Sequence, residues 1–192
     1  MILPSGQMDA SGWLATAKAI PSPNFNQRPP GTQVSLLVIH NISLPPGQFG
    51  TGAVADFFCN RLDIGAHPYY EEIAQLQVSA HFFISREGWI SQFVSVFDRA
   101  WHAGVSQFQG VENCNDYSVG IELEGCDELP YTHAQYASLI GVTEELCRVF
   151  PLITRERICG HEHIAPGRKK DPGPAFDWPR YLSGLESRLN NA

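Results

Sequence analysis

The chain contains a continuous apolar run, Ser35–Ile39, that has the length of a strand and no polar alternation. Such a run is typical of a strand buried on both faces of a sheet. It ends at His40 and Asn41, shortly before the turn-forming residues 45–47 (Pro-Pro-Gly). The end of a central strand, just before a loop, is a favoured place for a functional group. We therefore expect His40 and Asn41 to lie at a functional edge of the sheet.

Further strands are indicated by alternating apolar and polar residues. Val78–Ser85 and Trp89–Val96 alternate on either side of a short turn, which predicts a β-hairpin. Ser118–Glu124 is predicted to be another strand. Because successive side chains of a strand point to opposite faces, its apolar positions 119, 121 and 123 share one face. Gly120, Glu122 and Glu124 share the other face.

Helical periodicity is clearest in Thr132–Phe150. Thr132 and Gln135 form a capping-box pattern, an apolar stripe follows, and Pro151 stops the helix. Ala53–Leu62 is predicted to be a shorter helix. Pro179–Leu189 is predicted to be a C-terminal helix with Asp177 as its cap.

Strands interleaved with helices predict an α+β (mixed α/β) fold with a central mixed β-sheet flanked by helices. The length of 192 residues fits one domain covering residues 1–192. We expect residues 1–33, which are rich in Pro, Gly and Ser, to form an irregular lead packed on that domain.

The composition indicates which kinds of binding partner and which cellular compartment to expect. The net charge of −7 argues against a nucleic-acid binder that relies on phosphate neutralisation. The five cysteines include no CxxC pair, which favours reduced thiols in a cytosolic protein. Residues 1–13 lack the pattern of a signal peptide, and no apolar run is long enough to span a membrane. We therefore expect a cytoplasmic protein with no membrane partner.

The segment Gly160–Pro174 concentrates chemically useful side chains. It holds two imidazoles, two carboxylates, three basic residues and three prolines. Its Pro and Gly content predicts a loop of defined shape rather than a regular helix or strand. Such a loop suits holding two ligands of a catalytic zinc, with Lys169 beside them.

The chain has seven histidines from which zinc ligands could come. A catalytic zinc takes three protein ligands from His, Asp or Glu and keeps its fourth position open. His40, His161 and Asp171 form the best trio, and His163 is a rival ligand because it could share a face with His161 on an extended segment. We expect His133 to lie on the surface, His67 to lie in a loop and His81 to lie in the core. No role is assigned to His102.

Four blocks of the sequence, in the same order, resemble one known family. They are LVIHNISLPPG at 37–47, AWHAGVS at 100–106, VGIELEG at 119–125 and DPGPAFDW at 171–178. Residues 13–178 thus resemble the zinc-dependent N-acetylmuramoyl-L-alanine amidases (type 2 amidases), the family shared by phage lysozyme-amidases and peptidoglycan recognition proteins. Within it, the chain is most similar to the cytosolic 1,6-anhydro-N-acetylmuramoyl-L-alanine amidases of bacterial cell-wall recycling.

The resemblance implies roles for individual residues. It places one Zn²⁺ per chain on His40, His161 and Asp171, which demotes His163. It implies that Glu122 is a catalytic base and Lys169 a catalytic lysine that stabilises the oxyanion. It implies that Asn41 and Trp101 line the substrate groove.

The function that follows is hydrolysis of the bond between (1,6-anhydro-)N-acetylmuramic acid and L-alanine. The expected partner is a small anhydromuropeptide, with no obligate protein partner. The alternatives are a non-catalytic muropeptide-binding module and an amidase that acts on intact peptidoglycan. Gln77 and Asn113 are neutral where recycling amidases often carry arginine, which bears on substrate preference. Glu124 is expected to be solvated or ion-paired, and Arg168 and Lys170 either attract the acidic peptide stem or serve solubility.

Overall fold

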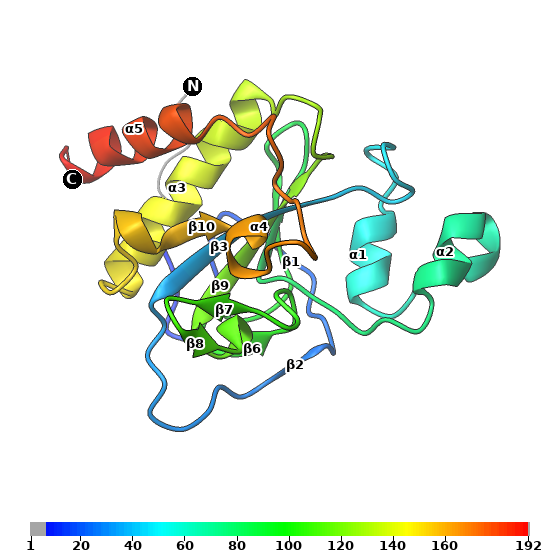
Figure 1. The fold of residues 1–192 in the computed structure, drawn as a ribbon, viewed down its shortest axis with the longest axis horizontal. Helices are drawn as coiled ribbons and strands as arrows, with labels where there is room; N and C mark the ends of the chain where they lie inside the picture. Colours follow the sequence, from blue (N-terminus) through cyan, green and yellow to red (C-terminus); the bar gives the residue numbers. More distant parts are fainter. Residues whose placement is uncertain (1–6, 192) are drawn as a thin grey trace.

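A six-stranded mixed sheet with the order β1-β5-β4-β9-β3-β10 forms the centre of the computed structural model, which describes residues 7–191 (Figure 1). β10, β3, β9 and β4 are parallel, β5 is antiparallel to β4, and β1 is parallel to β5. The strands are β1 (Lys18–Ala19), β3 (Leu36–Ile42), β4 (Phe82–Ile84), β5 (Ile90–Gln92), β9 (Ser118–Glu124) and β10 (Ile158–Gly160).

The two long strands β3 and β9 lie side by side in the middle of this sheet and share a seven-residue register. Leu36–His40 is fully buried, as the uninterrupted apolar run predicted. β9 has the predicted bounds, and all of its residues are buried. The expected central mixed sheet is thus confirmed.

One face of the sheet is covered by α3 (His133–Val149) and α5 (Trp178–Leu189), which pack beside each other (Figure 1). Leu37, Ile39 and Ile121 belong to the same hydrophobic cluster as the inner side chains of α3 and α5. Because side chains alternate along a strand, the neighbouring positions 38, 40, 120 and 122 point to the other face. That other face therefore carries His40 and Glu122, two of the predicted site residues.

The predicted helix ends are confirmed by their caps. The Thr132 hydroxyl accepts a hydrogen bond from Gln135 N, and the Gln135 side chain accepts one from Thr132 N, which forms the capping box. The Asp177 carboxylate accepts a hydrogen bond from Arg180 N at the start of α5. These bonds satisfy amide groups that have no partner inside the helix.

The predicted β-hairpin is formed by β4 and β5, whose strands are shorter than the alternating segments of the sequence. A second layer of the structure lies beyond this hairpin. It contains α1 (Ala53–Phe58), shorter than predicted, and α2 (Pro68–Ile73), which the sequence analysis missed. Both pack in a second hydrophobic cluster that includes Phe93. The His67 ring nitrogen accepts a hydrogen bond from Tyr69 N, so this histidine caps α2.

The predicted irregular lead contributes two short strands, and its first six residues lie outside the described part. β1 extends the main sheet, while β2 (Phe25–Asn26) pairs antiparallel with β6 (Arg99–Ala100). The remaining short elements are β7 (Gln107–Phe108), β8 (Val111–Glu112), and the 3-10 turns η1 (Ile64–Ala66), η2 (Cys114–Asp116) and η3 (Arg155–Arg157).

The prediction of an entirely non-helical loop after residue 160 is wrong for its first four residues. His161–Ile164 forms one helical turn, α4, directly after β10. No helix within residues 7–191 is long and apolar enough to cross a membrane. All five cysteines are free thiols.

Candidate metal centre and active-site groove

Three parallel strands bring the predicted functional residues to one edge of the sheet. Gly160 at the end of β10 pairs with Ile39, so His161 follows beside His40. On the other side of β3, His40 is the register partner of Glu122 on β9. Because parallel strands end at the same edge of a sheet, side chains far apart in the sequence converge there.

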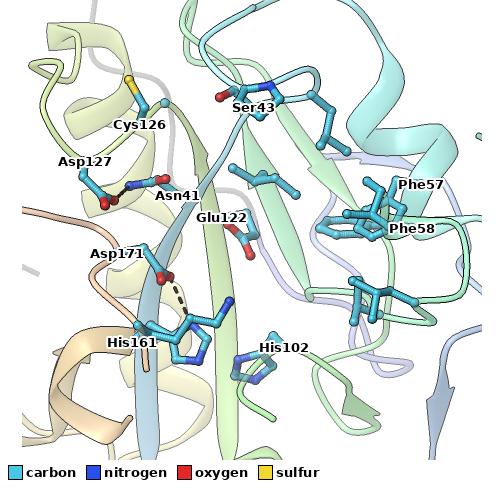
Figure 2. Close-up of a pocket in the computed structure, with 18 of the residues that line it drawn as sticks. Asn41, Ser43, Phe57, Phe58, His102, Glu122, Cys126, Asp127, His161 and Asp171 are labelled. Atoms are coloured by element: carbon cyan, nitrogen blue, oxygen red, sulfur yellow. Dashed lines mark hydrogen bonds and ion pairs between the residues drawn. The ribbon is translucent and has the colours of Figure 1, made fainter. Parts of the chain in front are cut away.

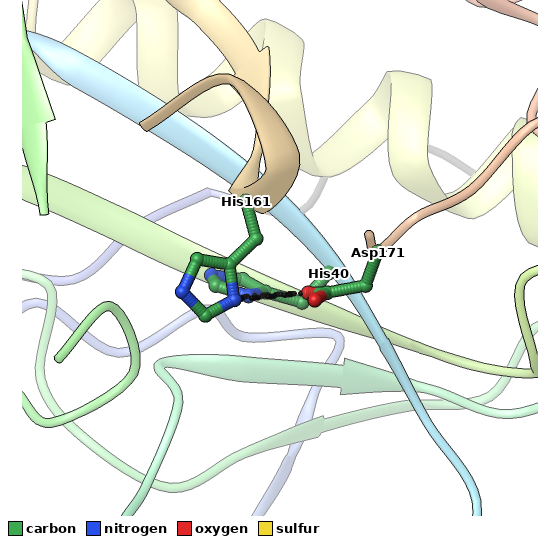
Figure 3. Close-up of side chains that lie close together, drawn as sticks. All are labelled: His40, His161 and Asp171. Carbon is green, nitrogen blue, oxygen red and sulfur yellow. Dashed lines mark hydrogen bonds and ion pairs between the residues drawn. The ribbon is translucent and has the colours of Figure 1, made fainter. Parts of the chain in front are cut away.

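The donor atoms of His40, His161 and Asp171 form a nearly equilateral triangle (Figure 3). His40 Nδ1 lies 3.0 Å from His161 Nδ1, and Asp171 Oδ2 lies 3.0 Å from each of these nitrogens. The edge of a zinc tetrahedron with bonds near 2.0 Å is roughly 3.3 Å. The three atoms are therefore arranged as one face of such a tetrahedron.

Hydrogen bonds behind the triangle orient the imidazole lone pairs. His161 Nε2 lies 3.0 Å from the Ala103 carbonyl oxygen. Because a carbonyl oxygen only accepts, Nε2 carries the proton and Nδ1 turns its lone pair into the triangle. His40 Nε2 lies 2.9 Å from His102 Nδ1, a geometry in which His40 can present Nδ1 in the same way.

The charges suit a divalent cation. Burial lowers the pKa of His40 to about 4, which keeps this imidazole neutral at neutral pH. Burial alone would raise the pKa of the Asp171 carboxyl, but its contacts with His161 and His40 outweigh burial and hold that pKa well below the usual range. Two neutral imidazoles and one carboxylate are a donor set typical of catalytic zinc, so these residues fit the metal.

Close packing at Gly160 lets the following loop return to the metal centre. A Cβ atom at Gly160 would lie 2.6 Å from Pro172 Cδ, so a larger residue would displace the segment that carries Asp171. Glu162 N also donates to the Asp171 carbonyl oxygen at 3.0 Å. Gly160 and the first turn of α4 therefore fix the position of Asp171.

His163 lies outside the triangle because the segment is helical rather than extended. Its ring packs against Trp178, and its Nδ1 accepts a hydrogen bond from Gly160 N at 2.9 Å. On one helical turn, residues two apart point in different directions. The expectation that His161 and His163 could share a face is therefore wrong.

A pocket of about 390 Å³ opens beside the triangle (Figure 2). The predicted residues Asn41, Trp101, Glu122 and Lys169 line it together with His161 and Asp171. Its opposite wall is apolar and includes Phe57 and Phe58, which the sequence analysis did not identify. The pocket thus combines a polar end at the donor triangle with an apolar wall.

Glu122 is buried in this pocket, and its Oε2 has no hydrogen-bond partner among the described residues. Burial, followed by the nearby Asp171 carboxylate, raises the pKa of Glu122 well above its ordinary value, while Lys169 opposes this rise. A buried carboxyl oxygen without a hydrogen-bond partner lowers the stability of the folded state unless water or a bound molecule makes that hydrogen bond. The arrangement leaves Glu122 available to exchange a proton with a molecule in the pocket.

The next acidic residue on the same strand face, Glu124, is buried and makes no ion pair within residues 7–191, contrary to expectation. It is 4% exposed, and its carboxylate accepts hydrogen bonds from Gly50 N and Arg86 N. These bonds join the loop after β3 and the turn between β4 and β5 to the end of β9. Glu124 therefore has a structural position, whereas Glu122 faces the pocket.

Two residues predicted to line the groove are held by neighbours. The Asn41 amide donates to Asp127 Oδ1 at 2.8 Å and to the Pro172 carbonyl oxygen at 3.2 Å. Trp101 Nε1 donates to Asn26 Oδ1 at 2.8 Å. Both side chains therefore have fixed orientations at the pocket.

The basic residues of the loop differ in their contacts. Arg168 donates to the Ala103 and Val105 carbonyl oxygens at 2.7 and 2.6 Å, so its guanidinium ties two loops together. Lys169 is exposed and lines the pocket, and its ammonium makes no hydrogen bond or ion pair within residues 7–191. Lys170 is exposed and does not line that pocket.

Other histidines have the structural positions expected of them, except one. His81 is fully buried, with Nδ1 accepting from Gly120 N and Nε2 facing the Asp98 carbonyl oxygen. His133 is exposed. His102 is the exception, because no role was expected for it and its Nδ1 lies 2.9 Å from Nε2 of His40, a predicted zinc ligand.

Known proteins of similar sequence belong to one family. The N-acetylmuramoyl-L-alanine amidase family model matches residues 30–174. The 1,6-anhydro-N-acetylmuramyl-L-alanine amidase AmpD of Haemophilus influenzae is 55% identical over 175 residues, which cover 91% of this chain and 95% of that protein.

Solved structures show the same fold. A crystal structure of a selenomethionine AmpD derivative is 52% identical, with a TM-score of 0.89 and coverage of 91% of this chain and 97% of that one. The Escherichia coli amidase AmiD, solved with the substrate anhydro-N-acetylmuramic acid-L-Ala-D-γ-Glu-L-Lys, is 27% identical, with a TM-score of 0.59 and coverage of 82% of this chain and 60% of that one. The chain therefore belongs to the N-acetylmuramoyl-L-alanine amidase family.

Proposed function

We propose that this protein is a zinc-dependent hydrolase that cleaves the amide between 1,6-anhydro-N-acetylmuramic acid and L-alanine of soluble muropeptides. The observation that carries the proposal is the convergence of three zinc-type donor atoms and an unpartnered buried carboxyl, Glu122, on one pocket. The name of the nearly full-length Haemophilus relative supports the anhydro sugar as the preferred substrate.

His40, His161 and Asp171 would hold one zinc ion, as their donor types and mutual distances support. When bound, zinc supplies Lewis acidity that polarises an amide carbonyl and lowers the pKa of water towards neutrality. The chain's own part is to keep both Nδ1 lone pairs directed at one point. It also keeps the Asp171 carboxylate ionised beside them.

Glu122 would take the proton of the attacking water and return it to the leaving amine. A general base works best when its pKa lies near the working pH, and burial raises the pKa of Glu122 in that direction. Its unpartnered Oε2 leaves an oxygen free for this transfer.

Lys169 would stabilise the negative charge that develops on the carbonyl oxygen. Its ammonium has no hydrogen-bond or ion-pair partner among the described residues, so it can reach a charge that appears only during the reaction. A donor of this kind contributes about 3 kcal/mol to transition-state stability. His40 and Glu122 thus come from strands, His161 comes from the α4 turn, and Asp171 and Lys169 come from the loop after it.

The groove would hold the sugar and the first residues of the peptide. Trp101 offers an aromatic face whose orientation is fixed by Asn26, and aromatic faces provide apolar contact at low entropy cost. Asn41 would contact the substrate through its carbonyl oxygen, since its amide hydrogens are engaged by Asp127 and Pro172.

We place this reaction in cell-wall recycling in the bacterial cytoplasm, with the anhydromuropeptide as partner and no protein partner required. The test incubates the zinc-loaded chain with soluble anhydromuropeptide and, separately, with intact peptidoglycan, and identifies the products by mass spectrometry. The expected products are 1,6-anhydro-N-acetylmuramic acid and a peptide with a free L-alanine amine, formed much faster from the soluble substrate. Equal or greater release from intact peptidoglycan would favour the alternative amidase. Tight binding of the muropeptide without hydrolysis would favour a binding module.

A further inference from the structure

The dipeptide His102–Ala103 contacts both metal histidines from behind. The His102 ring reaches His40, with Nδ1 lying 2.9 Å from His40 Nε2. The Ala103 carbonyl oxygen lies 3.0 Å from His161 Nε2. Two adjacent residues of one loop therefore contact the two imidazoles that are otherwise 121 residues apart in the chain.

This dipeptide is itself fixed by protein contacts. The side-chain oxygen of Asn115, in η2, accepts hydrogen bonds from His102 N at 3.1 Å and from Ala103 N at 2.8 Å. The other ring nitrogen of His102 lies 3.1 Å from the Ser118 hydroxyl. Asn115 is 7% exposed and Ser118 is fully buried, so both anchors are protected from competing water.

The strand beneath His102 is shaped to receive the ring. A Cβ atom at Gly120 would lie 2.5 Å from His102 Cγ, 2.6 Å from Nδ1 and 2.7 Å from Cδ2. The imidazole therefore lies directly on the backbone of β9, which only glycine permits. Its plane stands nearly perpendicular to that of His40, at 83°, with ring centroids 5.0 Å apart.

The hydrogen-bond donors and acceptors are consistent along the row formed by His40, His102 and Ser118. For His40 Nδ1 to offer a lone pair, Nε2 must carry the proton and donate it to His102 Nδ1. His102 then carries its own proton on Nε2 and donates to Ser118 Oγ, a hydroxyl that can accept it. Each donor in the row meets an acceptor, and the metal-facing nitrogen remains unprotonated.

We propose that His102 is a positioning residue that fixes the orientation and tautomer of His40, and that His102 with the Ala103 carbonyl sets the zinc affinity of the site. This proposal rests on the function proposed above. A hydrogen bond to the far nitrogen of a ligating imidazole orients the ring and raises its basicity, and loss of such a partner typically weakens metal binding about 10- to 100-fold.

Two substitutions at His102 separate the contact with His40 from the contact with Ser118. The side-chain oxygen of His102→Asn can occupy the place of Nδ1, so it keeps an acceptor for His40. The longer amide of His102→Gln reaches the place of Nε2, so it keeps the contact with Ser118 and loses the one with His40. His81→Gln is the control, because His81 is a neighbouring buried imidazole for which the structure shows no hydrogen bond to a metal ligand.

The experiment measures the zinc dissociation constant of the full chain by competition with a chelator, together with the absorption spectrum of the Co²⁺-loaded protein. His102→Gln is expected to weaken zinc binding about 10- to 100-fold and to alter the Co²⁺ bands, whereas His102→Asn stays within about threefold of wild type. His81→Gln is expected to lower thermal stability without weakening zinc binding. Wild-type affinity in His102→Gln, or equal losses in His102→Asn and His102→Gln, would overturn the proposal.

If the His102 variants do not fold, two substitutions at Asn115 test the proposal instead. Asn115 has no hydrogen bond to any of the three predicted zinc ligands and acts only through the dipeptide. Asn115→Asp keeps the acceptor oxygen for both backbone N–H groups, and Asn115→Leu removes it. Weaker zinc binding in Asn115→Leu than in Asn115→Asp is expected, and equal affinities would overturn the role of the dipeptide. A wild-type chain that binds no zinc would instead overturn the proposed function, so the two failures are distinguishable.

Discussion

Glu122 and Glu124 lie two residues apart on the same face of β9, yet the structure gives them opposite surroundings. Both oxygens of Glu124 accept hydrogen bonds from backbone N–H groups, while Glu122 Oε2 has no partner among the described residues. A carboxyl that is satisfied by the protein has no oxygen left for a substrate. The difference in role thus comes from position and not from residue type.

The first prediction concerns Glu122 as the proton-transfer group. Glu122→Gln keeps the shape of the side chain and removes the base, so kcat/KM is expected to fall about 10²- to 10⁴-fold while zinc binding is retained. Steady-state kinetics and metal analysis measure the two effects. Glu124→Gln is the matched control on the same strand face and should lose stability while keeping most of its turnover. A Glu122→Gln variant with wild-type turnover would remove Glu122 from the mechanism.

A second prediction concerns pH and stability. Because the folded pKa of Glu122 is raised well above the ordinary value of 4.5, the folded state holds this proton more tightly than the unfolded state does. The free energy of unfolding therefore decreases as pH rises from the unfolded pKa to the folded one. Glutamine does not titrate, so the metal-free Glu122→Gln variant lacks this decrease. The difference in unfolding free energy between the variant and the wild type should therefore grow from about pH 4 upwards. Urea unfolding over a pH series tests this, and a constant difference would contradict it.

Lys169 and Lys170 offer a matched pair for the third prediction. Lys169→Met removes the ammonium at the pocket and is expected to lower kcat about 10²- to 10³-fold, with a smaller change in KM, because the charge is needed only in the transition state. Lys170→Met removes an exposed ammonium that does not line the pocket and should leave both constants near wild type. Similar losses in the two variants would indicate a general electrostatic effect.

At the scale of elements, the site depends on how closely β9 approaches the loop at His102. The fourth prediction is that Gly120→Ala destabilises the protein by about 1–3 kcal/mol, because its Cβ atom would lie 2.5 Å from the His102 ring. Gly141→Ala is the control. Gly141 lies in α3 with no atom within 4 Å of its added Cβ, so alanine should stabilise the protein by up to about 1 kcal/mol. Thermal unfolding of both variants tests the contrast, which equal effects would contradict.

Elements with strong local signals could be predicted from the sequence. The uninterrupted apolar run of β3, the alternation in β9 and the capping box of α3 each specify their element locally, and the structure confirms all three. α2 and the two-residue strands carry no such signal, since tertiary contacts rather than propensity decide them. The sequence also did not predict the α4 turn, because the Gly and Pro residues around it favour a loop.

At the scale of the whole molecule, the candidate metal centre joins two distant segments of the chain. His40 comes from the interior strand β3, whereas His161 and Asp171 follow the neighbouring edge strand β10. Spacing alone could not choose between His161 and His163, because the choice depends on the local helical turn. The resemblance to the amidase family predicts His161 as the ligand. The contact of His102 with His40 depends on the packing of three separate segments, so no sequence pattern could have revealed it.

The fifth prediction tests the central claim that one zinc, held by His40, His161 and Asp171, is required for the amidase reaction. The measurement removes metal from the wild-type chain with a chelator, adds zinc back in steps, and records bound zinc, thermal stability and hydrolysis of soluble anhydromuropeptide together. We expect hydrolysis to disappear on chelation and to return in proportion to bound zinc, with saturation at one zinc per chain. Thermal stability should rise as zinc binds, because the ion binds the folded state, whereas His161→Ala should gain neither zinc nor turnover. Full hydrolysis by the metal-free chain would contradict the account.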